Sequence, residues 1–190
     1  MANHRERMVA SAALLIRERG AHPTAIADVL AHSGAPRGSA YHYFPGGRTQ
    51  LLCEAVDYAS AYIASRIENA GSAADALDAL VNGFRKQLAD TEFRAGCPVV
   101  AVAVESGGKA DVTPVVDRAA AAFTSWNGLM IDRLIDDGVA PERAEALAML
   151  VLTSVEGAIV VARTTRDMRP LELVHNQLRA LLEAAAPDER

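Results

Sequence analysis

The sequence predicts an all-α fold, in which a small N-terminal head of three helices is joined to a larger helical body. Hydrophobic residues make up 51% of the 190 positions, alanine is frequent, and runs of β-branched or aromatic residues are scarce. This composition favours helix over sheet. Apolar residues also recur at helical spacing between glycines and prolines that end or begin helices. A chain of this length can bury a hydrophobic core without disulfides or metal ions.

The first 47 residues are expected to form the head. Apolar positions at helical spacing predict the first helix over residues 3–19. A short second helix follows, with Thr24 as its N-cap. After a tight glycine turn, Pro36 fits the first position of a third helix that ends at His42, because a proline there removes no helical hydrogen bond. Two short helices joined by such a turn are typical of a helix-turn-helix.

Residues 48–190 are expected to form the body, as a series of helices separated by short and weakly marked breaks. Gly138 ends one long helix, and Pro141 begins the next. Five longer helices are expected at 48–69, 73–90, 112–137, 141–165 and 170–185. A short apolar helix is expected between the second and third of these, from Pro98 to about 106–108.

Charge is divided unevenly between these two parts. The whole chain has a formal net charge of −5, yet residues 1–48 carry six arginines against three acidic residues, a net charge of +3. The remainder carries 13 basic and 21 acidic residues, a net charge of −8. A basic head on an acidic body is the asymmetry expected when one end of a protein meets phosphate groups.

Several classes of protein are not expected. The N-terminus is too polar for a secretion signal, and the longest apolar stretch, 147–162, is interrupted by polar residues and is shorter than a bilayer requires. Cys53 and Cys97 form neither a disulfide framework nor a metal-ligand pattern, and catalytic motifs of familiar spacing are lacking. We therefore expect a cytoplasmic protein that is not an enzyme and carries no metal or cofactor.

The stretch from Thr24 to Arg48 resembles the DNA-binding head of the TetR family of transcriptional repressors. The most diagnostic part is the ending Tyr41-His42-Tyr43-Phe44-Pro45, followed by a basic residue that opens the next helix. The body is similar to the LmrA/YxaF-like branch of that family, whose members respond to drugs or flavonoid-type aromatics. The residues that carry this second resemblance are Gly96-Cys97-Pro98-Val99, Glu105, Trp126, Leu129, Glu156-Gly157-Ala158 and Ala162-Arg163.

The resemblance implies that the third helix reads operator DNA in the major groove. Arg37 has the donor geometry to bind guanine O6 and N7, and Gly38 lets the backbone approach the DNA. Arg48 stands at the N-terminus of the long helix, where the helix dipole favours a phosphate. Ala40 and Phe44 are expected to face the core instead. The residues expected to contact double-stranded operator DNA are Thr24, Arg37, Gly38, Ser39, Tyr41, His42, Tyr43 and Arg48.

The last two helices are expected to make a homodimer, which would present two heads to a palindromic operator. Residues 147–162 are apolar on nearly every face, so this helix must be covered on both sides. By resemblance, the helices near 141–165 and 170–185 form a four-helix bundle with their symmetry mates.

A small hydrophobic or aromatic effector is expected to bind within the body. Phe123, Trp126 and Met130 share one face of the 112–137 helix, which by resemblance walls the effector cavity. Glu156 is a carboxylate in an apolar helix, and either an ion pair with a nearby arginine or a ligand contact would account for it. The residues expected to contact the effector are Tyr62, Phe84, Leu88, Cys97, Phe123, Trp126, Met130, Met149 and Glu156.

The function predicted from these features is a ligand-responsive transcriptional repressor, released from its operator when the effector binds. The long helix that begins at Arg48 belongs to both parts, and we expect it to act as the lever between them. Two alternatives remain open at this level. One is a helical small-molecule carrier, and the other is a redox-sensing dimer that uses Cys97, each without sequence-specific DNA binding.

Overall fold

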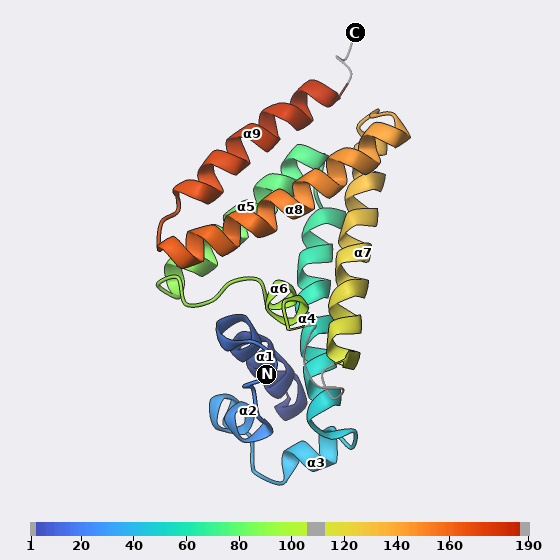
Figure 1. Ribbon diagram of the computed structural model, residues 1–190. Helices are drawn as coiled ribbons and strands as arrows, with labels where there is room; N and C mark the ends of the chain where they lie inside the picture. The colour runs from blue at the N-terminus through green and yellow to red at the C-terminus, as the bar shows by residue number, and fades with distance from the viewer. Residues whose placement is uncertain (1–2, 106–112, 187–190) are drawn as a thin grey trace. The chain divides into compact units, whose positions relative to one another are not determined.

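The computed structural model describes residues 3–105 and 113–186, and every regular element in these two ranges is a helix (Figure 1). The all-α prediction is therefore confirmed for the described part of the chain. Its helices are α1 His4–Arg19, α2 Ile26–Ser33, α3 Ser39–Tyr43, α4 Gly47–Glu68, α5 Ala73–Asp90, α6 Pro98–Ala103, α7 Thr113–Asp136, α8 Pro141–Thr165 and α9 Arg169–Ala185.

Two helix starts in the head differ from the sequence prediction. The N-cap of α2 is Ala25 and not Thr24, and the Ala25 N–H donates to the Asp28 side chain at 3.1 Å. Helix α3 begins at Ser39 and not at Pro36, because the Pro36 carbonyl accepts from the Ser39 N–H at 2.9 Å in a tight turn that precedes the helix. In the body, α6 ends at Ala103; the predicted end at 106–108 and start at 112 lie outside the described residues.

The chain divides into two compact units. Unit 1 comprises Met1–Ala61 and Cys97–Ala122, and unit 2 comprises Tyr62–Gly96 and Phe123–Arg190. All of the expected head, residues 1–47, falls in unit 1, together with α6 and the first parts of α4 and α7. The division into head and body after residue 47 stays a prediction.

Unit 1 has a core in which α1 is central. Helix α1 begins with a capping box, in which Asn3 and Glu6 each bond the other's backbone N–H. Its apolar side chains Met8, Ala12 and Ile16 are fully buried, and α1 packs against α2, α3 and α6. Complete burial of side chains of this size contributes about 1.5–3 kcal/mol each for the larger ones. The head is therefore built around α1.

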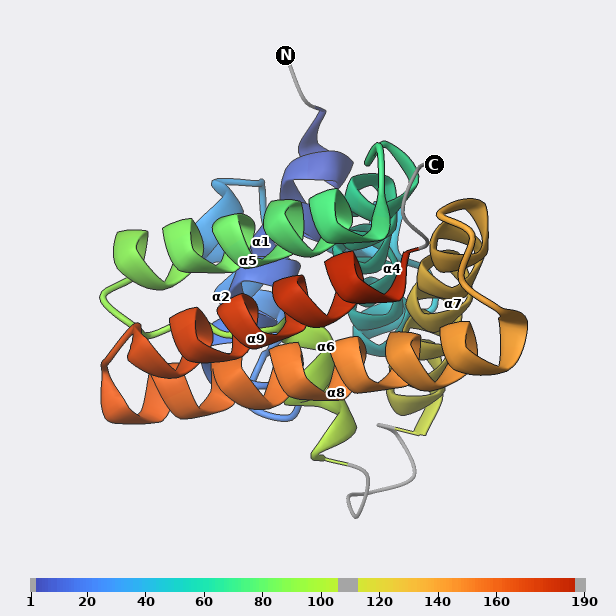
Figure 2. The same cartoon turned by 90° about the horizontal axis from the view of Figure 1, so that it is seen from above.

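Unit 2 is a layered arrangement in which α9 packs against both α5 and α8. Figure 2 shows these three helices side by side, with α9 in red between green α5 and orange α8. Helix α9 is strongly amphipathic and buries Leu171, Leu178 and Leu182. Asp78 of α5 adds a polar link, because it accepts from His175 at 2.7 Å and pairs with Arg179, both on α9.

Candidate nucleic-acid interface and ligand pocket

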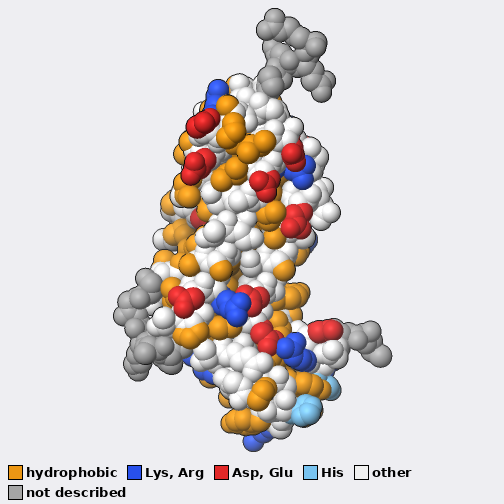
Figure 3. All heavy atoms as spheres, turned by 90° about the vertical axis from the view of Figure 1, so that its right-hand side faces the viewer, with side chains coloured by type: hydrophobic (Ala, Val, Ile, Leu, Met, Phe, Trp, Pro, Cys, Tyr) orange, Lys and Arg blue, Asp and Glu red, His pale blue; other side chains and the backbone are white. Residues whose placement is uncertain are grey.

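Helix α3 presents its polar and aromatic side chains to solvent. Tyr41 is 77% exposed, Arg37 and His42 are exposed, and Tyr43 is half-buried. In the space-filling view, hydrophobic and histidine side chains lie together at the surface at the lower end (Figure 3). Ser39 is half-buried and Gly38 is exposed in the turn before the helix. Six of the eight residues expected to contact DNA thus lie on one short exposed segment.

The opposite side of α3 is fixed in the core of unit 1. Ala40 and Phe44 are each 1% exposed, which confirms the expectation that they face inward. The guanidinium of Arg5, from α1, lies over the Phe44 ring at 5.5 Å, and such a cation–π contact is favourable. Burial of two residues flanking the exposed face leaves α3 little freedom to rotate about its axis.

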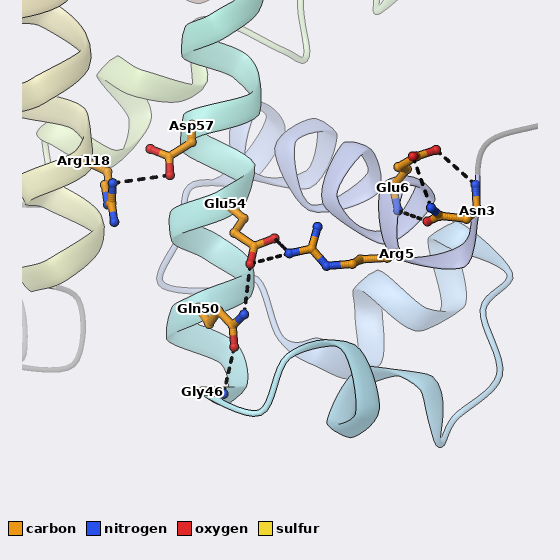
Figure 4. Close-up of polar contacts among 8 residues, drawn as sticks. All are labelled: Asn3, Arg5, Glu6, Gly46, Gln50, Glu54, Asp57 and Arg118. Atoms are coloured by element: carbon orange, nitrogen blue, oxygen red, sulfur yellow. Dashed lines mark hydrogen bonds and ion pairs between the residues drawn. The ribbon is translucent and has the colours of Figure 1, made fainter.

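A chain of hydrogen bonds ties the turn after α3 to α4 and α1 (Figure 4). The Gly46 N–H donates to the Gln50 side-chain oxygen at 2.8 Å, and the Gln50 amide donates to Glu54 at 3.0 Å. Arg5 donates to both oxygens of Glu54, at 2.8 and 2.7 Å. The turn closes at Gly47, whose φ of +68° lies in the left-handed region that favours glycine. These bonds link the turn after α3 to both α4 and α1, and they hold the C-terminal end of α3 in place.

Arg48, predicted to contact a phosphate at the start of the long helix, bonds to backbone carbonyls of unit 1 in this structure. Its Nε donates to the Thr24 carbonyl at 2.8 Å, and a terminal nitrogen donates to the Ala21 and His22 carbonyls at 2.5 and 2.9 Å. An arginine fork bound to three carbonyls is well suited to hold a loop. In this structure Arg48 fixes the α1–α2 connection, residues 20–25, and its expected phosphate contact would require this arrangement to change.

Thr24 also makes its hydrogen bonds within unit 1. It is fully buried, its hydroxyl donates to the Gly20 carbonyl at 2.7 Å, and its N–H donates to the Ala21 carbonyl at 3.0 Å. Both of its donors are therefore used internally. The predicted N-cap role of Thr24 is wrong, because Ala25 caps α2, and its phosphate contact stays a prediction.

Glu105 holds the same α1–α2 connection from the other side, a role that the sequence prediction missed. Its carboxylate accepts from the His22 N–H at 2.9 Å. Gly20 has φ +90°, and a Cβ placed there would lie 2.1 Å from a Glu105 oxygen. From the sequence, Glu105 is notable only as part of the family resemblance and Gly20 only as the end of the first helix, so neither residue is connected with the other. Glu105 follows α6, so this connection is held by residues distant in the chain.

Unit 2 contains a pocket with an almost wholly apolar lining. It is lined by Ile63 and Ile67 of α4, Leu80 and Phe84 of α5, Trp126 and Met130 of α7, and Ala148, Val151, Leu152, Val155 and Glu156 of α8. Its cavity volume is about 30 Å³, and since a single water needs about 10–15 Å³ on this measure, there is room for only a few water molecules. A drug-sized molecule would have to displace lining side chains.

Four of the nine predicted effector contacts line this pocket, namely Phe84, Trp126, Met130 and Glu156. The other five do not. Tyr62 is 53% exposed and Met149 is 48% exposed, while Leu88 and Cys97 are buried but do not belong to the lining, and Cys97 is part of unit 1. Phe123 packs edge-on against Trp126, with ring centroids 5.7 Å apart. Sequence reasoning missed the α4 isoleucines and the α8 valines.

Glu156 is the one charged residue among those that line the pocket. The sequence prediction named Arg94, Arg163 or a ligand donor as its partner. Arg94 is exposed, and its Nε donates to the Thr91 carbonyl at 3.1 Å. Arg163 packs against Gly96, where an added Cβ would lie 3.3 Å from its Cδ.

Helix α8 carries an uncharged stripe on its solvent side. Met149, Leu150, Val160 and Val161 are each 44–48% exposed. Between and beside them, the uncharged exposed positions are Ala146, Thr153, Gly157, Thr164 and Thr165, and the exposed Glu145 lies at the N-terminal end of the stripe. At 25 residues, α8 is long and apolar enough to cross a membrane by length and composition, contrary to the sequence expectation, although core helices of soluble proteins pass the same test.

The structure brings no metal-binding cluster together within residues 3–105 and 113–186. Of the two cysteines, Cys97 is buried and Cys53 is half-buried. Burial raises the pKa of the Cys53 thiol above its ordinary value, an effect that the nearby Arg118 guanidinium opposes. A raised pKa lowers the thiolate fraction and hence the reactivity of the thiol.

Two family models match the chain. The model described as bacterial regulatory proteins of the tetR family matches residues 9–55. The model described as the C-terminal domain of LmrA/YxaF-like transcriptional regulators matches residues 73–177. Among similar proteins, an uncharacterized HTH-type transcriptional regulator of Mycobacterium tuberculosis is 60% identical over 99% of this chain and 98% of its own. The HTH-type transcriptional regulator LmrA of Bacillus subtilis is 30% identical over 88% of this chain and 90% of its own.

Two solved structures of TetR-family regulators have the same fold as this chain. A TetR transcriptional regulator from Chloroflexus aurantiacus has a TM-score of 0.74 at 28% identity, covering 95% of this chain and 94% of that chain. A cysteine mutant of the TetR family regulator CifR, complexed with a 26-base-pair operator DNA, has a TM-score of 0.74 at 23% identity and covers 95% and 97% of the two chains. The second likeness shows the fold alone.

Proposed function

Because the chain belongs to the TetR family of bacterial transcriptional regulators, in its LmrA/YxaF-like branch, we propose that it is a cytoplasmic repressor that binds a palindromic operator as a homodimer. A small hydrophobic or aromatic effector releases it. The observation that carries the proposal is the geometry of α3, whose outer face is exposed while Ala40 and Phe44 lock its inner face into the core.

The exposed segment has the chemistry that DNA recognition needs. Arg37 and Gly38 lie in the turn that leads into α3, and Tyr41 and His42 follow on its exposed face. Arginine forks bind guanine edges, whereas tyrosine and histidine donors bind phosphate oxygens. The +3 net charge of residues 1–48 favours the approach of DNA, although the chain as a whole is acidic.

Dimerisation is supported by the uncharged stripe of α8. The stripe holds two pairs of exposed large apolar side chains, Met149 with Leu150 and Val160 with Val161, separated by small residues, and a symmetric partner would cover them. Small residues in the row, such as Gly157, would let two helices approach closely, since an added Cβ there meets no atom within 4 Å. On α9, Leu173 is 54% exposed and extends the apolar surface.

Release by an effector is supported by helix α4, which contributes side chains to both the pocket and the head. Helix α4 provides Arg48 to the α1–α2 connection and Ile63 and Ile67 to the pocket. The pocket has room for only a few waters, so we propose that a drug-sized occupant displaces the lining side chains and moves α4, α5, α7 or α8. We propose that this opened state holds the two heads at a spacing that does not fit the operator, and the effector's preference for it weakens DNA binding.

A selection from a random duplex pool tests this function. The purified protein is expected to enrich a palindrome whose half-sites are one helical turn apart, about 10–10.5 base pairs, or a multiple of that distance. The Arg37→Ala variant should enrich a sequence with reduced information at one position of each half-site. Enrichment of no common sequence by the wild-type protein would contradict the proposal and favour a ligand carrier.

A further inference from the structure

The α1–α2 connection, residues 20–25, is held through its backbone. The carbonyls of residues 20, 21, 22 and 24 each accept a hydrogen bond, from the Thr24 hydroxyl or from the Arg48 guanidinium. The Ala25 N–H donates to the Asp28 side chain at 3.1 Å. A loop whose backbone groups are bonded at this density favours one conformation, because each alternative would break several bonds. Helix α2 begins directly after this loop.

Glu105 reaches the same connection from the end of α6, a helix that packs against α1. Its Oε2 atom accepts from the His22 N–H at 2.9 Å. Its Oε1 atom lies beside Gly20, since a Cβ added to that glycine would be 2.1 Å away from it. Both carboxylate oxygens therefore face the connection, and the glycine makes room for one of them.

The fold of unit 1 does not depend on this one bond. The core of the unit is formed by apolar side chains of α1, whereas His22 and Pro23 at the tip of the connection are exposed. Arg19 of α1 also pairs with Asp28 of α2 at 2.8 Å. Loss of the Glu105 carboxylate is therefore expected to leave the helices folded and to let the connection open locally.

The place of α2 matters for DNA because α2 is the first helix of the helix-turn-helix. In this motif the first helix crosses the DNA backbone while the second lies in the major groove. Residues 34–38 join α2 to α3 in a short turn, so a shift of α2 also shifts the exposed face of α3. A head that samples several positions binds its operator more weakly, since only a fraction of the molecules is ready to bind.

We propose that Glu105 is a positioning residue for operator binding, which acts through the His22 N–H on the α1–α2 connection without touching DNA. The inference rests on the proposed function and adds to it a residue from outside the helix-turn-helix. Charge alone predicts the opposite effect, because removal of a carboxylate reduces repulsion of the phosphates and strengthens DNA binding. Loss of a positioning carboxylate weakens it.

Two substitutions of Glu105 separate position from charge. Fluorescence anisotropy measures the Kd for the palindromic duplex enriched from the random pool, at two salt concentrations. Glu105→Ala removes the acceptor and should raise this Kd by about tenfold or more. Glu105→Gln removes the charge but keeps an oxygen that can accept from the His22 N–H, so its Kd should stay within about threefold of the wild type. Both variants should keep the wild-type salt dependence, because no phosphate contact is lost.

Asp117→Ala is the matched control, because it removes one negative charge from an exposed position of the same unit. Its Kd should equal that of the wild type or fall below it. The thermal midpoint shows whether each variant is folded, and Glu105→Asp, whose carboxylate is one methylene shorter, replaces the alanine variant if that one unfolds. Without DNA, amide hydrogen exchange in residues 20–25 should be faster in Glu105→Ala than in the wild type and in Glu105→Gln.

Three results would overturn the inference. These are operator binding by Glu105→Ala that equals or exceeds that of the wild type, an equal loss in Glu105→Ala and Glu105→Gln, and unchanged hydrogen exchange in residues 20–25 of the alanine variant. Failure of the proposed function has a different signature, because the wild-type protein then enriches no palindrome at all. A wild type that binds its palindrome beside variants that bind it equally well would refute the role of Glu105 alone.

Discussion

At the scale of single residues, the α1–α2 connection depends on side chains that reach it from far along the sequence. Arg48 binds its carbonyls and Glu105 accepts from the His22 N–H. Gly20 makes room for Glu105 and adopts φ +90°. This connection leads into the helix-turn-helix, so it bears on the position of α2 and α3.

Gly20→Ala is expected to lower the free energy of unfolding by about 1–3 kcal/mol, because alanine is strained at positive φ and its Cβ would lie 2.1 Å from a Glu105 oxygen. Urea denaturation measures the change. The control is Gly128→Ala in α7, where an added Cβ meets no atom within 4 Å. That control should stabilise by about 0.5–1 kcal/mol, since alanine favours helix interiors over glycine. Equal effects of the two substitutions would refute the role given to Gly20.

Arg37→Ala is expected to weaken operator binding by about 1–3 kcal/mol and to relax the preference at one base pair of each half-site. The cause is loss of a bidentate contact to a base edge. Affinity for a set of single-base operator variants measures both effects. Arg94→Ala, which removes an exposed arginine in unit 2, serves as the control and should change neither. A uniform loss across all operator variants would instead assign Arg37 to the phosphate backbone.

At the scale of helices, α8 and α9 combine packing inside unit 2 with an exposed face suited to a partner. Their inner faces follow the expected apolar periodicity, with Leu171, Leu178 and Leu182 buried on α9. The outer face of α8 remains apolar, with Val160 and Val161 each 47% exposed. A helix that served only an internal core would carry polar residues there.

Val160→Glu is expected to convert the protein from dimer to monomer, because each dimer would bury two uncompensated carboxylates near its symmetry axis. Light scattering after size exclusion measures the mass. Ile135→Glu is the matched control, since Ile135 is 41% exposed on α7 and lies outside the α8 stripe. A dimer that persists with Val160→Glu would place the interface elsewhere.

The α5–α9 contact predicts a pH dependence of stability. Burial raises the pKa of Asp78, but hydrogen bonds from His175 and Arg179 outweigh it, and the net pKa lies below the ordinary value of 3.8. A carboxyl whose folded-state pKa is depressed stabilises the fold above its unfolded-state pKa, and this stabilisation is lost as the pH falls through the folded value. Asp78→Asn should therefore flatten the fall of unfolding free energy below about pH 4.

Urea denaturation at a series of pH values measures that slope. Asp132→Asn, which changes an exposed aspartate of α7, provides the comparison and should keep the wild-type dependence. An Asp78→Asn variant with an unchanged slope would show that the bonds from α9 do not favour the ionised carboxyl.

At the scale of the whole molecule, sequence patterns predicted the helices and the exposed aromatic segment of α3, but not the contacts between distant segments. Of the stripe predicted on α7, Trp126 and Met130 line the pocket, whereas Phe123 does not. On α8 the predicted Met149 faces solvent while Val151 and Val155 line the pocket. That helix is apolar all round, so periodicity alone could not choose its inner face.

The missed contacts have a common physical cause. The bond from Glu105 to the His22 N–H joins residues 83 positions apart, and short-range patterns carry no signal for such a pair. Arg48 was expected to bind phosphate because it opens a helix, yet the carbonyls of the α1–α2 connection lie within its reach and accept its donors. Tertiary partners therefore decided the orientation of both side chains.

The measurement that tests the central claim most directly is fluorescence anisotropy of the protein on the DNA upstream of its own gene, against a scrambled duplex, at two salt concentrations. A sequence-specific repressor should bind the upstream DNA at least about a thousandfold more tightly than the scrambled duplex, with both affinities falling as salt rises. Equal affinity for the two duplexes, using ligand-free protein refolded from denaturant, would contradict the account.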